Sequence, residues 1–170
     1  MPKMQPRGRN DAKTLQLNKK AVRRVLKAFN NNQPELIDSV THPSIIDHSP
    51  APGLPPGLEG MKRQIRNLHR GFPDVHFEEE MLVAEKDMVI LRWRMMGHWR
   101  AQYFFAAQPT GKEVVHYGHE IVRLKEGKII EHRDTADPLM FMDKLGALNA
   151  TTMEEMTKFG LRHYDIEPFR

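Results

Sequence analysis

Residues 113–137 read EVVHYGHEIVRLKEGKIIEHRDTAD and contain the pattern that decides the fold. Two runs rich in β-branched residues flank Lys125-Glu126-Gly127-Lys128, the strongest turn signal in the chain. Gly127 can take a positive φ without steric cost, so a two-residue turn at Glu126-Gly127 predicts a β-hairpin. We expect this turn to set the register of the two strands.

The predicted register gives the opposed pairs Leu124–Ile129, Val122–Glu131, Glu120–Arg133 and His119–Asp134. The opposite charges of Glu120 and Arg133 are of the kind that stabilises cross-strand pairs, and they support this register. Because opposed residues share a face, His119 and Asp134 are predicted to point the same way, with Tyr117 beside them. Such a pair on an apolar face is either a half-exposed polar contact or an acid/base pair in a pocket.

Length and composition indicate one domain. Of the 170 residues, we assign 1–13 to a disordered basic arm, 14–148 to the folded domain and 149–170 to a C-terminal helical extension. The chain has no cysteine, which excludes disulfides and thiolate chemistry. No run of about 18 apolar residues occurs, so we expect no membrane span and a cytoplasmic protein.

Positive charge is concentrated at one end of the chain. Residues 1–24 contain eight Lys and Arg against a single acid, Asp11, although the whole chain carries only +4. A nucleic-acid surface would place basic residues on a folded face with aromatic residues between them, and no aromatic residue precedes Phe29. We therefore interpret the basic segment as a solvated arm and expect no nucleic-acid partner.

The order of predicted elements indicates the fold class. Helical spacing of apolar residues predicts helices over 14–29, 34–40 and 58–71, and two further segments over 139–148 and 152–161. Strands are predicted over 44–50, 75–84, 88–97 and 101–106 and in the two arms of the hairpin. This order is typical of an α+β fold. We predict a curved antiparallel sheet that forms a cone, an α+β barrel, closed by the N-terminal helices and able to hold one ligand.

Several short motifs occur in a fixed order. They are DHSP at 47–50, FPD at 72–74, VILRW at 89–93, PTGK at 109–112 and RLKEGKIIEHRDTAD at 123–137. Over residues 21–148 the chain resembles the SnoaL-like polyketide cyclases and predicted ester cyclases, within the nuclear transport factor 2-like, cystatin-like superfamily. It departs from that family at Arg133, where Trp is common, and in the tail beyond Leu148.

The resemblance implies a cofactor-free intramolecular aldol cyclisation of a hydrophobic, carbonyl-containing substrate bound in the cone. It further implies a general acid/base carboxylate on the last strand, assisted by a histidine on the neighbouring strand. By motif these catalytic residues are Asp134 and His119, the two that the predicted register pairs. The residues that we expect to contact the substrate are His48, His98, Tyr117 and Trp93.

Two further expectations concern metals and assembly. His116 and His119 are close in sequence but fall on opposite faces of a strand, so we expect no metal site. The convex face of the predicted sheet carries more apolar residues than a monomer usually exposes, and relatives often pair through it. We therefore expect a homodimer.

Two other functions remain open at the level of sequence. The same cone could belong to a non-catalytic small-ligand-binding or scaffold protein, because this fold serves both purposes. An epoxide hydrolase would need an Asp-Arg-Asp network, to which Asp134 and Arg133 are a partial match whose side chains face opposite ways.

Overall fold

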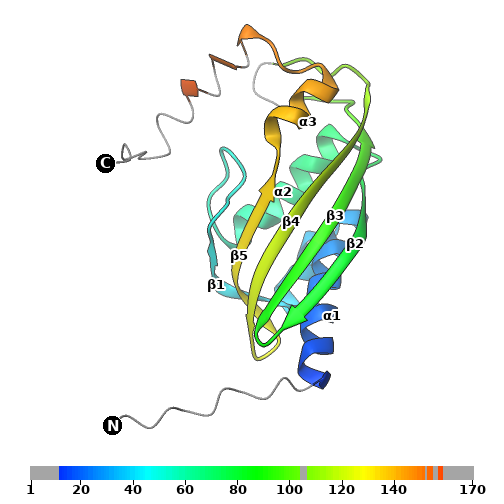
Figure 1. The fold of residues 1–170 in the computed structure, drawn as a ribbon. Coiled ribbons are helices and arrows are strands. Elements are labelled where there is room, and N and C mark those ends of the chain that lie inside the picture. The colour runs from blue at the N-terminus through cyan, green and yellow to red at the C-terminus, as the bar shows by residue number, and fades with distance from the viewer. Residues whose placement is uncertain (1–11, 104–106, 152, 155–156, 159–170) are drawn as a thin grey trace, which may run out of the picture.

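The computed structural model describes residues 12–103, 107–151, 153–154 and 157–158 (Figure 1). In chain order the elements are α1 (Ala12–Asn31), the 3-10 helix η1 (Pro34–Ser39), β1 (Thr41–Asp47), α2 (Leu58–Gly71), β2 (His76–Glu85), β3 (Met88–His98), β4 (Glu113–Lys125), β5 (Lys128–Ala136) and α3 (Pro138–Leu145). The predicted α+β class is confirmed.

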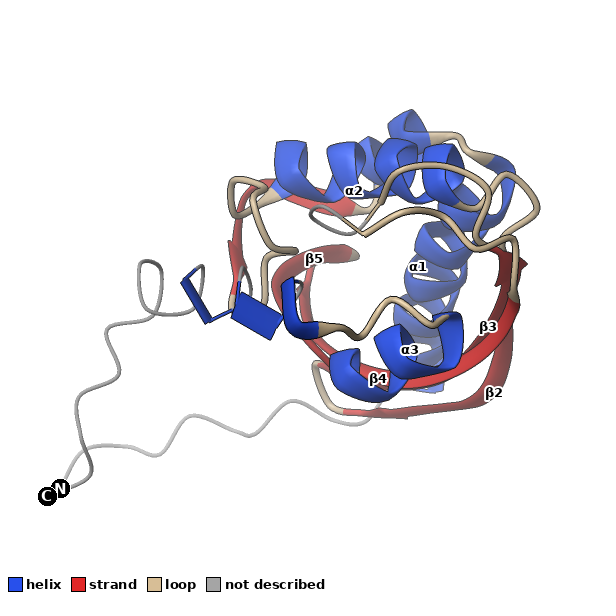
Figure 2. Cartoon of the chain, turned by 90° about the horizontal axis from the view of Figure 1, so that it is seen from above, coloured by secondary structure: helices blue, strands red, loops and turns tan. Residues whose placement is uncertain are grey.

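The strands curve around α1, and α2 lies across the remaining open side of the sheet (Figure 2). Helix α1 has one apolar stripe, formed by Ala21, Val22, Val25 and Ala28, and this stripe is buried. Phe77 of β2 packs edge-on against Phe29 and against Trp93, with 5.5 Å between ring centroids in both contacts. We call the face that packs on the helices the inner face of the sheet, and the opposite one the outer face.

The five strands form one sheet in the order β1-β5-β4-β3-β2. Strand β1 pairs with β5 in parallel, so the sheet is mixed and the prediction of a wholly antiparallel sheet is wrong at this edge. A parallel pair needs a long crossover connection. Here α2 and three strands separate β1 from β5, and nothing in the short β1 sequence fixed its direction.

The β4–β5 hairpin has the predicted turn but a different register beyond it. Glu126 and Gly127 have φ values of 52° and 75°, and Lys125 lies opposite Lys128 as predicted. Between Leu124 and Arg123 the register then shifts by one residue, because β5 has an extra residue at Ile130. Consequently Glu120 lies opposite Asp134, and the predicted Glu120–Arg133 and His119–Asp134 pairs are wrong.

Three other expectations meet the structure in part. Residues 101–103 are not a strand, and the rest of the strand predicted over 101–106 lies outside the described residues. The predicted basic arm lies outside them as well, apart from its last two residues, which open α1. In the predicted C-terminal extension, the described residues from 150 onward are helical. No helix in the described part of the chain is long and apolar enough to cross a membrane.

Candidate active site

The candidate site lies on the inner face of the sheet, where strand alternation brings polar side chains into an apolar interior. On β4 the residues with even numbers point inward, from Val114 to Leu124, and among them are His116, Gly118 and Glu120. On β5 the extra residue reverses the alternation, so that His132 and Asp134 point inward and Arg133 outward. The bulge therefore decides which polar groups of β5 enter the interior.

Glu120 and Asp134 stand opposite one another on adjacent strands, and we call them the carboxyl pair. Directly opposed residues in an antiparallel ladder have Cβ atoms roughly 5 Å apart, so the two acids face the same small volume. The Oδ1 atom of Asp134 is buried and accepts no hydrogen bond from the described residues. The Asp134 backbone N–H donates to Ser49 Oγ at 2.5 Å, which ties β5 to the loop after β1.

Burial raises the pKa of Asp134 to about 7, and the neighbouring Glu120 carboxylate raises it further than His132 lowers it. Burial also raises the pKa of Glu120, against a smaller opposing effect of His132. Both residues keep some exposed surface, but desolvation of the carboxyl groups themselves is the main cause of both shifts. A carboxyl group that titrates near neutral pH can both accept and donate a proton.

A second buried pair supports the first. His132 Nδ1 donates to Asp47 Oδ1 at 3.0 Å, and their side chains are only 9% and 4% exposed. Asp47 also accepts from the backbone N–H groups of Ser49 at 3.1 Å and Gly57 at 3.4 Å.

The electrostatics of this second pair favour its ionised form. Burial alone would raise the pKa of Asp47, but its hydrogen bonds and the charge of His132 hold it low. Burial likewise opposes the charged form of His132, yet Asp47 and the nearby carboxyl groups raise its pKa. The raised pKa of His132 favours a positive charge beside the carboxyl pair.

An aromatic wall stands beside the carboxyl pair. Trp93 of β3 lies opposite Gly118, and a Cβ at that glycine would come within 2.1 Å of Trp93 Cζ2. Only glycine lets the indole lie flat over β4 at this point. His116 is buried, stacks on Phe141 of α3 at 4.6 Å between centroids, and lies 5.9 Å from the Trp93 ring. Burial lowers the pKa of His116, which favours its neutral form.

The structure places His119 away from Asp134. The His119 ring is on the outer face, where Arg92 Nη1 donates to its Nε2 at 3.1 Å. The prediction that His119 and Asp134 share a face is wrong, because the extra residue at Ile130 turns Asp134 to the inner face. Asp134 remains a site candidate, and His119 does not.

Three of the four predicted substrate contacts also lie outside the interior. His48 Nε2 contacts Glu131 Oε1 at 2.7 Å, and His98 Nδ1 contacts Asp74 Oδ2 at 2.6 Å, both at the protein surface. Tyr117 is 39% exposed under the guanidinium of Arg92. Trp93 is buried on the inner face, and its contact with a substrate stays a prediction.

The sequence reasoning missed Glu120, His132 and Asp47. One signal was present: the strict register set Val122 against Glu131, an apolar residue against a charged one. The bulge replaces this with Val122 opposite the buried His132, and it sends Glu131 outward to Arg123, whose Nε donates to Glu131 Oε2 at 2.8 Å.

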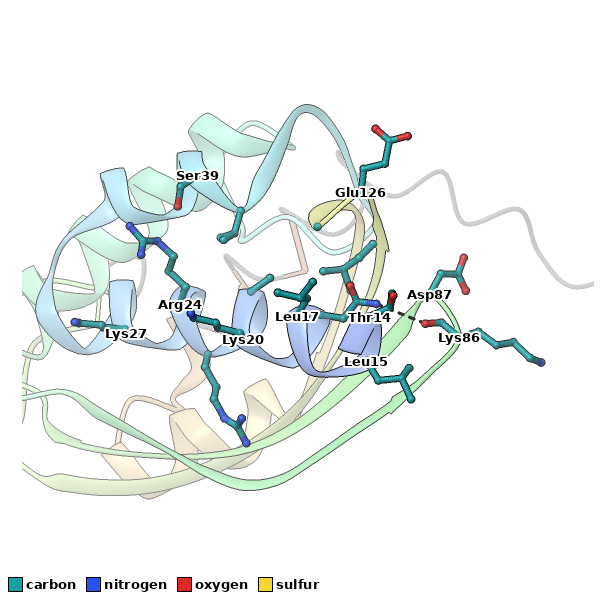
Figure 3. Close-up of a pocket in the computed structure, with 16 residues that line it drawn as sticks. Thr14, Leu15, Leu17, Lys20, Arg24, Lys27, Ser39, Lys86, Asp87 and Glu126 are labelled. Atoms are coloured by element: carbon teal, nitrogen blue, oxygen red, sulfur yellow. Dashed lines mark hydrogen bonds between the residues drawn. The ribbon is translucent and has the colours of Figure 1, made fainter. Parts of the chain in front are cut away.

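A separate groove of about 1370 Å³ lies beside α1 at the hairpin-turn end of the sheet (Figure 3). Its walls come from α1 between Thr14 and Lys27, from Ser39 and Val40 at the end of η1, and from the two hairpin turns at Lys86-Asp87 and Glu126-Gly127. Basic side chains of α1, among them Lys20, Arg24 and Lys27, project along it. None of the inner-face polar residues lines this groove, so it is distinct from the candidate site.

A family model for SnoaL-like polyketide cyclases matches residues 19–145, well over half of the chain and the region that contains every residue of the candidate site. The chain belongs to this family. No protein in a search of curated sequences matches it significantly.

This SnoaL-like chain is also similar to solved structures, among which three show the range. TsrD from Streptomyces laurentii is 25% identical with a TM-score of 0.71, and the match covers 78% of this chain and 97% of TsrD. A candidate polyketide cyclase from Bacillus cereus ATCC 10987 is 25% identical with a TM-score of 0.71, covering 82% and 87%. AclR, a candidate hydroxylase from Streptomyces galilaeus, is 25% identical with a TM-score of 0.68, covering 79% and 99%.

Proposed function

We propose that this SnoaL-like chain is a cyclase or isomerase that acts on a hydrophobic, carbonyl-containing substrate through general acid/base catalysis by Asp134. One observation carries the proposal. The Asp134 carboxyl points into the interior, has a buried Oδ1 without a partner among the described residues, and has a pKa raised to about 7. A buried acceptor of this kind with a near-neutral pKa is what a general base requires.

In the proposed aldol-type step, Asp134 removes a proton from a carbon between two carbonyl groups of the substrate. The resulting carbanion attacks a second carbonyl carbon of the same molecule, a carbon–carbon bond forms, and the protonated Asp134 returns its proton so that the oxygen of that carbonyl becomes a hydroxyl group. Because such a methylene is already acidic, positioning and a modest base are sufficient. The step uses side chains alone, and the Trp93 indole offers an apolar surface for the substrate.

Two findings support this reading over other activities. The matching family model is that of polyketide cyclases, and one of the similar structures is described as a candidate polyketide cyclase. AclR, however, is described as a candidate hydroxylase, so the fold alone does not choose the reaction. The alternative function is non-catalytic binding of a small hydrophobic ligand, which would need no titrating carboxyl.

The test is turnover of a panel of polyketide-like diketo esters by the full chain and by Asp134→Asn. The substitution keeps the shape of the side chain and removes its titrating group, so turnover should fall roughly 10²- to 10⁴-fold while ligand affinity changes much less. Asp143→Asn, at an exposed position of α3, is the matched control and should retain wild-type turnover. Equal rates for wild type and Asp134→Asn would transfer the role to another residue. Binding of the panel without turnover would favour the ligand-binding alternative.

We propose further that two copies pair through the outer face of the sheet. This face exposes large apolar side chains on three neighbouring strands, namely Met81, Val83, Ile90, Tyr117 and Ile121. The acids and bases around them are already matched within the chain, as in Arg92–Glu80 and Arg94–Glu78, both at 2.7 Å. A twofold interface brings the same patch of each copy together, which suits a face that is apolar and internally neutralised.

A further inference from the structure

We propose that Glu120 is a second catalytic carboxyl, and that Glu120 and Asp134 hold one proton between them. One member then takes the proton from the donor carbon while the other protonates the acceptor oxygen. This inference rests on the proposed function and deepens it by assigning the acid partner of Asp134. It also replaces His119, which the sequence had predicted to assist and which lies on the outer face.

The geometry comes from the ladder. Glu120 and Asp134 are register partners on adjacent strands, and both side chains point to the inner face. No hydrogen bond joins the two carboxyl groups directly, and Asp134 Oδ1 has no partner among the described residues although it is buried. A substrate oxygen or carbon placed between the pair would therefore lie within reach of both acids.

The charged groups around the pair affect how many protons it binds. Positive charge comes from His132 on β5, whose own partner is Asp47 on β1. Among the other groups that face this interior, His116 on β4 is buried with its pKa lowered, and β3 presents the uncharged Trp93. The buried faces of α1 and α2 present no titratable side chain, being formed by Asn18, Ala21, Val22, Val25, Ala28, Gly60, Met61, Ile65, Leu68 and Gly71.

Two carboxylates facing each other in a desolvated site repel, so the second proton leaves the pair only at a much higher pH than the first. Burial raises the pKa of both groups, and the Glu120 charge adds to the shift at Asp134. His132 opposes both shifts, which favours the loss of one proton from the pair. With one proton left, the pair contains one acid and one base at the same time.

This arrangement balances the aldol step without an outside proton. The basic member gains the proton from the donor carbon, and the acidic member gives its proton to the oxygen of the attacked carbonyl. After the carbon–carbon bond has formed, the pair still holds one proton, now on the other member. The next turnover needs only the transfer of that proton across the pair.

The first arm of the test needs no substrate. The full chain is labelled with ¹³C at the Asp and Glu side-chain carboxyl carbons, and the Glu120 and Asp134 signals are assigned by their loss in Glu120→Gln and Asp134→Asn. In the wild type both signals should shift in two coupled steps. In Glu120→Gln the Asp134 signal should titrate in one step at lower pH, because the neighbouring charge is gone, and Asp134→Asn should act in the same direction on Glu120. The matched control is Glu113→Gln, an exposed carboxyl on β4, which should leave both signals unchanged.

The second arm uses any diketo ester that the wild type turns over. Turnover by Glu120→Gln should fall at least about 10²-fold and its pH–rate profile should lose one limb, whereas the double variant should be no slower than the slower single variant. Two results would overturn the proton-sharing pair. One is a Glu120 signal that titrates in a single step near the usual Glu value, and the other is an Asp134 titration that is the same in the wild type and in Glu120→Gln. Slow turnover by Asp134→Asn together with normal turnover by Glu120→Gln would reject the catalytic role of Glu120 and leave that of Asp134 in place. Normal turnover by Asp134→Asn would reject the proposed function, while the titrations would still decide whether the proton is shared.

Discussion

In this interior the space available to a side chain restricts the residue type as much as charge does. Trp93 lies over β4 only because Gly118 has no side chain, and the same indole stands beside the carboxyl pair two residues further along the strand. The types of residue needed for acid/base chemistry could be recognised in the sequence, which predicted Asp134 as the acid/base carboxyl on the last strand; that role stays a proposal. Its partners could not be named, since strand alternation assigns a side chain to a face only when the register is known.

Gly118→Ala should destabilise the fold by about 1–3 kcal/mol, the usual penalty for overpacking a filled interior. The added methyl would meet the Trp93 ring at 2.1 Å, so the indole has to move. Urea unfolding followed by tryptophan fluorescence measures the change. Trp93→Phe makes room for the methyl, so the double variant should lose less stability than the sum of the two single changes. Simple additivity would show that the two residues do not compete for the same space.

At the scale of elements, the turn of the hairpin could be predicted and its bulge could not. The Glu126-Gly127 dipeptide has a local conformational requirement that any sequence reader can see, and both residues have positive φ. The extra residue at Ile130 has no such signature, because isoleucine suits a regular strand and a bulged one equally. The opposite charges of Glu120 and Arg133 favoured the wrong register.

The same limit applies to β1. Its pairing partner, β5, is 85 to 88 residues away in sequence, and its parallel direction depends on how α2 and the hairpins pack. Asp47 at the end of β1 reaches His132 only through this pairing. The contact between Asp47 and His132 therefore could not be predicted from local sequence patterns.

At the scale of the whole molecule, the two faces of the sheet differ in character. Its inner face holds the carboxyl pair under the helices, and its outer face exposes the apolar side chains through which we propose that two copies pair. The overall class and the cone followed from the order of elements, because helices, strands and helices in that order have few ways to bury one face of a sheet.

Static light scattering should give a mass close to twice the 19.8 kDa of one chain at micromolar concentration. Ile121→Asp places a charge on the exposed apolar patch and should shift the mass toward that of one chain. Leu17→Asp, which adds the same charge at a 52% exposed site on α1, is the control and should leave the dimer intact. A wild-type mass near that of one chain would exclude the homodimer.

We expect Asp134 to bind a proton near neutral pH inside the folded chain. The folded pKa is raised to about 7 from an unfolded value of 3.8, so between these values the folded state binds a proton that the unfolded state has lost. The stability that this proton gives is therefore fully present below the unfolded value, and it is lost as the pH rises toward the folded one. Each pKa unit corresponds to about 1.4 kcal/mol.

The most direct test compares the free energy of unfolding of the wild type and of Asp134→Asn by urea denaturation, at a series of pH values from about 4 to 8. Asn cannot titrate, and ionisable groups far from this site contribute equally to both proteins, so the difference between the two curves reports Asp134 together with its coupling to Glu120. We predict that Asp134→Asn gains stability relative to the wild type by a few kcal/mol as the pH rises, most steeply between pH 5 and 7. A difference that stays constant over this range would show that Asp134 titrates as an ordinary exposed carboxyl, and it would contradict the account.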